Sequence, residues 1–282
     1  MSDRGLPLTR ALVLGGGGIA GIAWHTGILQ GLAESGVDAT SADLYVGTSA
    51  GATVAAQLAG GVAIDELFRR QMDPETLRTE RTPAVSIADL IAQLAPIYTE
   101  AIDDADRRRR LGVMALAADT VEESVRREVI VARLRDLDWP DHRMAIVVVE
   151  ALTGHRVVFD DRSGVTLVDA VAASSAVPGV WPPVTIAGTR YVDGGIWSLT
   201  NTDLAAGHDR VLVLAPLTDP GLHVEVAGLG DDVRAEVITP DAASLEAFGI
   251  DVLDPAVRDP SVRAGLAQGR AEADRVRALL AD

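Results

Sequence analysis

Ser49 lies in the turn Gly47-Thr48-Ser49-Ala50-Gly51, and a serine in this setting can act as a nucleophile toward a carbonyl carbon. The turn follows the apolar run 44–46, which favours a strand, and precedes the small-residue segment 50–59, which favours a helix that packs closely on a sheet. Gly47 and Gly51 relieve crowding at such a strained turn. Because the Gly-x-Ser-x-Gly pattern is weak evidence by itself, the interpretation depends on this context.

A second glycine turn, Gly15-Gly16-Gly17-Gly18-Ile19-Ala20-Gly21, directly follows the apolar run 11–14. Without Cβ atoms, the backbone can direct its N–H groups toward a ligand at the start of a helix. We therefore expect Gly17 and Gly18 to donate hydrogen bonds to the oxyanion of a tetrahedral intermediate.

The same glycines also match the Gly-x-Gly-x-x-Gly fingerprint of dinucleotide-binding proteins. That site needs an acidic residue at the end of the second strand, whereas here Asp43 precedes this strand and Gly47 ends it. The chain has no lysine, which excludes a P-loop, a Schiff base and a Ser-Lys mechanism, and no cysteine, which excludes a thiolate metal site.

Asp193 is the preferred candidate for the base, because it ends a predicted strand and precedes Gly194 and Gly195, which give the backbone freedom behind it. A carboxylate is ordinarily a weak base, but desolvation in a dry cleft raises its pKa, while a helix dipole and oxyanion donors stabilise the developing charge. The alternative is a Ser-Asp-His triad, for which His208 and His223 have the required chain order.

The elements that must position these residues begin as strand, helix, strand and helix over residues 11–61, which predicts a parallel sheet. The first helix is predicted over 19–32 and the second over 50–59. The remaining predictions are strands at 144–149, 156–159, 210–214 and 236–238, a hairpin at 184–192 turning at Ala187-Gly188, and helices at 168–173 and 256–280.

Residues 62–139 are rich in charged residues, leucine and alanine and contain no extended strand pattern. Amphipathic helices are predicted over 87–102 and 121–134. The run Arg107-Arg108-Arg109-Arg110 between them is expected on a solvated helix face near acidic neighbours, with a lipid-headgroup contact as the alternative. We interpret 62–139 as a helical insertion, or lid, in a single domain spanning residues 1–282.

The composition restricts the partners of the protein. The formal net charge of −16 argues against nucleic acid and against electrostatic attraction to anionic lipid. Residues 1–10 contain no apolar signal-peptide core, and no stretch approaches the roughly 20 apolar residues that span a bilayer. A cytoplasmic location is therefore expected.

Together these motifs resemble those of the patatin-like phospholipase family of Ser-Asp dyad lipid acyl hydrolases. The turn 15–21 resembles the glycine-rich oxyanion block, the turn 47–51 the nucleophile elbow with Ser49, and Asp193-Gly194-Gly195 the block of the base. The segment 174–183 and Asn201 also fit, so the resemblance covers roughly residues 10–215. It implies a three-layer α/β/α sandwich with a mainly parallel sheet.

The resemblance further implies an acyl-enzyme mechanism that needs neither a metal nor an organic cofactor, a lipid or other acyl ester as substrate, and transient contact with a membrane surface. One position departs from the family, which usually has arginine or lysine where this chain has Ala20. Because that basic side chain is thought to hold the loop or an anionic headgroup, we expect neutral esters to be hydrolysed at least as well as anionic phospholipids. A catalytically silent lipid-binding protein of the same fold is the second alternative.

Overall fold

The computed structural model of the protein describes residues 8–77, 80–134 and 137–281. Its strands are β1 (Arg10–Leu14), β2 (Leu44–Gly47), β3 (Arg143–Glu150), β4 (Arg156–Phe159), β5 (Val184–Ile186), β6 (Thr189–Asp193), β7 (Arg210–Leu214) and β8 (Arg234–Ile238). Its α-helices are α1 (Gly18–Glu34), α2 (Ala50–Ala59), α3 (Ile64–Met72), α4 (Pro74–Leu77), α5 (Ile87–Glu100), α6 (Asp104–Ala117), α7 (Glu123–Arg133), α8 (Leu167–Ser174), α9 (Leu222–Ala227), α10 (Ala242–Phe248), α11 (Arg258–Ala271) and α12 (Ala273–Leu280). Short 3₁₀ helices are η1 (Gly194–Ile196), η2 (Thr202–Ala205) and η3 (Pro255–Val257).

The strands of the described residues form one sheet of eight strands in the order β5-β6-β3-β2-β1-β7-β8, with β4 also paired to β3. The pairs β1–β2, β1–β7, β2–β3 and β7–β8 are parallel, whereas β4, β5 and β6 form antiparallel pairs. The sheet is therefore mainly parallel, as predicted. Because β1 and β2 are parallel neighbours, the two glycine turns that follow them both lie at the carboxyl ends of the parallel strands.

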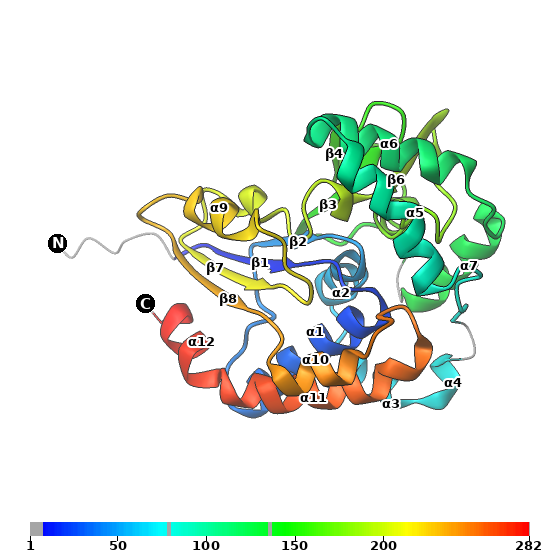
Figure 1. Cartoon of the computed structure of the whole chain (residues 1–282). Coiled ribbons are helices and arrows are strands. Elements are labelled where there is room, and N and C mark those ends of the chain that lie inside the picture. The colour runs from blue at the N-terminus through cyan, green and yellow to red at the C-terminus, as the bar shows by residue number, and fades with distance from the viewer. Residues whose placement is uncertain (1–7, 78–79, 135–136, 282) are drawn as a thin grey trace.

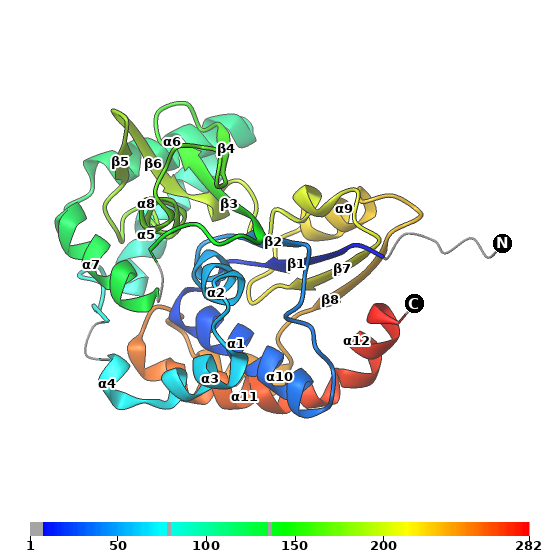
Figure 2. The same cartoon turned by 180° about the vertical axis from the view of Figure 1, so that it is seen from behind.

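Helices flank the sheet on both faces, which confirms the predicted α/β class (Figure 1). On one face, residues of α1, α2 and α8 pack with alternate residues of the strands in the largest core cluster. The opposite face of β1, β2 and β7 packs against η2 and α9 in a second, smaller cluster. Figure 2 shows from behind that α1, α3, α11 and α12 lie on the side of the sheet away from α9.

The segment 62–139, predicted as one helical insertion, divides into two parts in the structure. The helix α3 packs against α1 and α11, on the body of the molecule. The helices α5, α6 and α7 instead lie at the end of the sheet that contains β3 to β6, as Figures 1 and 2 both show. The arginine run 107–110 belongs to α6, a helix that was not predicted as a separate element.

The prediction of a single closing helix over 256–280 was wrong. The chain forms η3, then α11, and bends at Glu272 before α12 begins. The bend has a packing cause, because α11 lies along α1 whereas α12 packs against β7 and β8. Across the described parts of the chain, every helix is too short or too polar to cross a membrane.

Candidate active site

Ser49 occupies the junction between β2 and α2 with a backbone conformation that is unusual for a residue with a side chain. Its φ is 53° and its ψ is −114°, and its side chain is largely buried, at 8% exposure. A Cβ at Gly51 would lie 1.8 Å from the Leu14 carbonyl oxygen, so only glycine allows α2 to start this close to β1. Such strain at a polar residue is a feature of nucleophile turns, where the hydroxyl projects away from both elements.

Two serines at the end of α8 hold the backbone of the turn. The Ser49 N–H donates to Ser174 Oγ at 3.0 Å, and Ser174 Oγ donates in turn to the Val147 carbonyl at 2.7 Å. Ser175 Oγ donates to the Ser49 carbonyl at 3.4 Å. Because all three serines are buried, these bonds satisfy polar groups of the strained turn that water does not reach.

We expect Ser174→Ala to leave the Ser49 N–H without an acceptor and thereby loosen the turn. Such a loss of a buried partner destabilises a protein by about 1–3 kcal/mol, and small displacements of a nucleophile lower turnover by about 10²-fold. Ester hydrolysis and thermal unfolding should be measured beside Ser35→Ala, which removes a similar hydroxyl bond to Gly31 far from the turn. Equal activity of the two variants would contradict a positioning role for Ser174.

Asp193 ends β6 and is almost fully buried, at 4% exposure. Its Oδ1 accepts a hydrogen bond from the Gly195 N–H at 2.7 Å. Burial raises the pKa of this carboxyl to about 6, although interactions with the Ser49 hydroxyl, the Gly195 N–H and the charge of Arg126 oppose the rise. The structure thus brings together Ser49 and Asp193, which are separated by 144 positions in the sequence.

The glycine turn after β1 presents free N–H groups at the start of α1. The N–H groups of Gly15 and Gly16 donate to carbonyls of neighbouring loops. Those of Gly17, Gly18 and Ile19 have no acceptor among the described residues. These donors lie in the first turn of a helix, where the backbone dipole favours a negative charge.

Glycine is needed at position 18 for two reasons. Gly18 has a φ of +61°, in the left-handed region, and an added Cβ would lie 2.7 Å from the Val252 carbonyl oxygen. The Ala20 N–H donates to the same carbonyl at 3.0 Å. Because Ala20 is fully buried, an arginine or lysine at this position would displace core side chains.

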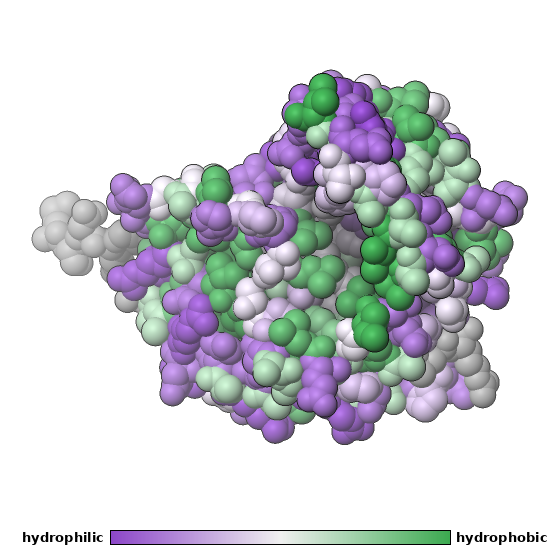
Figure 3. Space-filling view, viewed as in Figure 1, coloured by the Kyte–Doolittle hydropathy of each residue, from purple (hydrophilic) through white to green (hydrophobic). Residues whose placement is uncertain are grey.

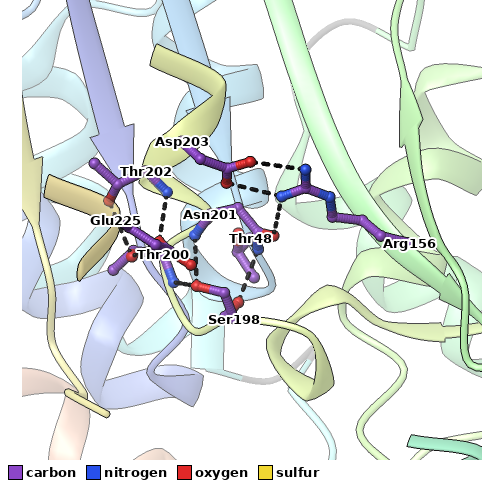
Figure 4. A network of polar contacts seen from close by, with 8 residues as sticks. All are labelled: Thr48, Arg156, Ser198, Thr200, Asn201, Thr202, Asp203 and Glu225. Atoms are coloured by element: carbon purple, nitrogen blue, oxygen red, sulfur yellow. Dashed lines mark hydrogen bonds and ion pairs between the residues drawn. The ribbon is translucent and has the colours of Figure 1, made fainter. Parts of the chain in front are cut away.

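The loop that follows Asp193 connects the parts of the site through a polar network (Figure 4). Asn201 lies at its centre and is fully buried, with Nδ2 donating to Thr48 Oγ1 at 3.0 Å and to the Ser198 carbonyl at 2.7 Å. Its Oδ1 accepts from Arg156, which also forms a two-fold ion pair with Asp203 at 2.8 and 2.7 Å. Since Thr48 precedes Ser49, the network ties the nucleophile turn to the loop of Asp193.

A largely apolar cavity of about 300 Å³ opens on Ser49 and Asp193. One wall contains the three consecutive glycines 16–18, and another contains apolar residues of α5 together with Leu111 of α6. Figure 3 shows hydrophobic side chains beside a hollow, in the region where α5 lies in Figure 1. A cavity of this size and polarity is suited to an acyl chain.

The two histidines considered for a triad lie elsewhere. His208 precedes β7 and so lies at the amino ends of the parallel strands, whereas Ser49 follows β2 and lies at their carboxyl ends. The five residues of β7 separate these two ends of the sheet by roughly 15 Å. His223 is exposed on α9, and neither histidine lines the cavity around Ser49.

The arginine run of α6 lies outside the walls of this cavity. Arg107, Arg109 and Arg110 form ion pairs with acidic residues in or next to their own helix, while Arg108 stacks over Trp197 at 4.1 Å. A different arginine, Arg126 of α7, lines a small recess beside Ser49. Nothing in the sequence pattern of α7 distinguished it, because its burial depends on distant segments.

Comparisons with known proteins agree with the motifs. A family model described as patatin-like phospholipase matches residues 12–206. The structure of VipD from Legionella pneumophila is 15% identical, with a TM-score of 0.48, and the match covers 95% of this chain and 67% of VipD. The type III effector protein ExoU is 16% identical, with a TM-score of 0.42, over 96% of this chain and 53% of ExoU. No curated protein matches significantly.

Proposed function

The chain belongs to the patatin-like phospholipase family, and from this premise we propose that it is a serine lipid acyl hydrolase that uses Ser49 and Asp193 as a dyad. The observation that carries the proposal is that Ser49, on a strained turn, and the buried carboxyl of Asp193 line the same apolar cavity. A triad is less well supported, since His208 and His223 lie away from this cavity.

In the proposed mechanism, Ser49 Oγ attacks the carbonyl carbon of an ester while Asp193 accepts the hydroxyl proton. The carbonyl oxygen becomes an oxyanion, which the N–H groups of Gly17 and Gly18 stabilise. Collapse of the intermediate breaks the bond to the alcohol, which takes the proton back from Asp193. Asp193 then takes a proton from the water molecule that attacks the acyl-enzyme, and it returns this proton to Ser49 Oγ as the bond to the acyl group breaks and the fatty acid is released.

The acyl chain is proposed to lie in the cavity lined by α5, with this helix acting as a lid. Exposed apolar side chains lie in and just after this helix, namely Ile91, Tyr98 and Ile102, which are 58%, 59% and 85% exposed. Exposed apolar side chains on a helix that lines the cavity support transient contact with a lipid aggregate, while the net charge of −16 disfavours an anionic aggregate.

The reaction of Ser49 with a fluorophosphonate tests the proposal without a choice of substrate. We expect covalent labelling at Ser49, with a rate that rises with pH through about 6, because Asp193 accepts a proton only in its ionised form. The label should be located by mass spectrometry and its rate followed from pH 4.5 to 8.5. A folded protein that takes no label at Ser49 would instead be a silent lipid-binding protein.

A further inference from the structure

Arg126 lies on α7 with its side chain turned into the molecule, at only 4% exposure. It lines a recess of about 20 Å³ whose other walls include Gly18, Ser49 and Ser175. This recess and the 300 Å³ cavity both contain Ser49, so the nucleophile lies between an apolar space and one that contains a cation.

The guanidinium of Arg126 has no hydrogen-bond acceptor for its Nε and Nη1 atoms among the described residues. The other arginine of the recess, Arg133, forms a two-fold ion pair with Glu80, at 2.9 and 2.5 Å. Burial lowers the pKa of Arg126 to about 9, which still leaves it charged at neutral pH. Within the described parts of the chain, Arg126 is therefore a buried cation without a bonded counterion, although the charges of Glu80 and Asp193 act on it from a longer distance.

Trp181 fixes the orientation of this cation. The Arg126 guanidinium lies over the Trp181 ring at 4.1 Å from the ring centroid. Stacking uses the face of the planar group and leaves its N–H donors free at the edge. A planar edge of this kind matches the two oxygens of a phosphate or carboxylate.

Burying a guanidinium whose N–H groups lack acceptors is unfavourable even with the charges of Glu80 and Asp193 nearby, and an oxyanion bound at its edge would offset this penalty. The recess has room for about one or two water-sized groups, so it fits oxygen atoms but excludes a bulky headgroup. The acyl chain has its own space in the apolar cavity. An anion at Arg126 therefore belongs on the alcohol side of the ester.

We propose that Arg126 binds a phosphate or carboxylate group on the alcohol side of the substrate, within a few bonds of the carbonyl that Ser49 attacks. This inference rests on the proposed hydrolase function. It reverses the expectation drawn from Ala20, because a cation from α7 supplies a positive charge that the glycine turn lacks. The substrates favoured are esters of small anionic alcohols, without a large group beyond the phosphate.

The test compares two substrates with the same acyl chain, 1-decanoylglycerol and 1-decanoylglycerol 3-phosphate, both in monomeric form. We expect the wild type to show a kcat/KM at least 10-fold higher for the phosphate ester. Arg126→Gln should lower the ratio of the two kcat/KM values at least 10-fold, and Arg126→Lys should lower it less. Arg127→Gln is the matched control, since Arg127 is half exposed and pairs with Asp169. Thermal unfolding verifies that each variant folds.

Calorimetric titration with glycerol 3-phosphate and with glycerate gives a readout that does not need turnover. Binding to the wild type that Arg126→Gln abolishes would support the anion site, and the two ligands separate phosphate from carboxylate recognition. Equal loss of kcat/KM on both substrates in Arg126→Gln would overturn the inference, because Arg126 would then act through Asp193. A wild type that binds glycerol 3-phosphate but hydrolyses neither ester would refute the hydrolase function alone.

Discussion

Ser49→Ala is expected to abolish ester hydrolysis, with a loss of at least about 10⁴-fold in kcat. The hydroxyl is the only group that the proposed mechanism places in a covalent bond with the acyl chain. Hydrolysis of p-nitrophenyl esters and labelling by a fluorophosphonate should both disappear. Turnover near that of the wild type would show that another residue is the nucleophile.

The fold should survive this change, because the backbone bonds of the turn to Ser174 and Ser175 do not involve the Ser49 side chain. A second variant separates strain from chemistry. Ser49→Gly also lacks the hydroxyl, but glycine adopts a φ of 53° without a Cβ clash. We expect it to be inactive and at least as stable as Ser49→Ala in thermal unfolding.

The parts of the site that the sequence predicted are those encoded locally. The turns 15–21 and 47–51 each lie between an apolar run and a helical pattern, so strand, turn and helix could be read within a few residues of one another. The position of Asp193 before two glycines was equally local. That these three segments come together follows from parallel pairing of β1 with β2 and from the place of β6 beside β3.

The features that the sequence did not predict depend on contacts between distant segments. Ser174 meets Ser49 across 125 positions, and the buried Arg126 stacks on Trp181 and shares a recess with Gly18 at the start of α1. The helix α6 lacked a clear apolar period, since few of its residues are buried. One of these is Gly112, where a Cβ would lie 1.8 Å from the Ala151 carbonyl oxygen. Glycine lowers helix propensity, but here it allows close packing.

Asp193→Asn should reduce ester hydrolysis about as much as Ser49→Ala, because one carboxylate performs every proton transfer in the proposed mechanism. The amide keeps the shape of the side chain and can still accept the Gly195 N–H, but it cannot accept a proton at neutral pH. Asp209→Asn is the matched control, since Asp209 lies at the amino ends of the parallel strands, where its carboxylate accepts hydrogen bonds from the N–H and hydroxyl of Thr9. His208→Ala and His223→Ala should change activity little, and a loss of several orders of magnitude in either would favour a triad.

Asp193→Asn should lower activity and yet, at pH 8, raise the free energy of unfolding. This difference separates loss of the base from loss of the fold. The Asp193 pKa is raised from 3.8 to about 6 in the folded protein, so folding is opposed by its ionisation. This penalty is absent below pH 3.8, grows between pH 3.8 and 6, and amounts to about 3 kcal/mol at most above pH 6. Asparagine carries no charge, so the free energy of unfolding of Asp193→Asn relative to the wild type should rise between pH 4 and pH 8. Denaturant unfolding at both pH values measures this difference, and an unchanged difference would mean that Asp193 is not a buried, raised-pKa carboxyl.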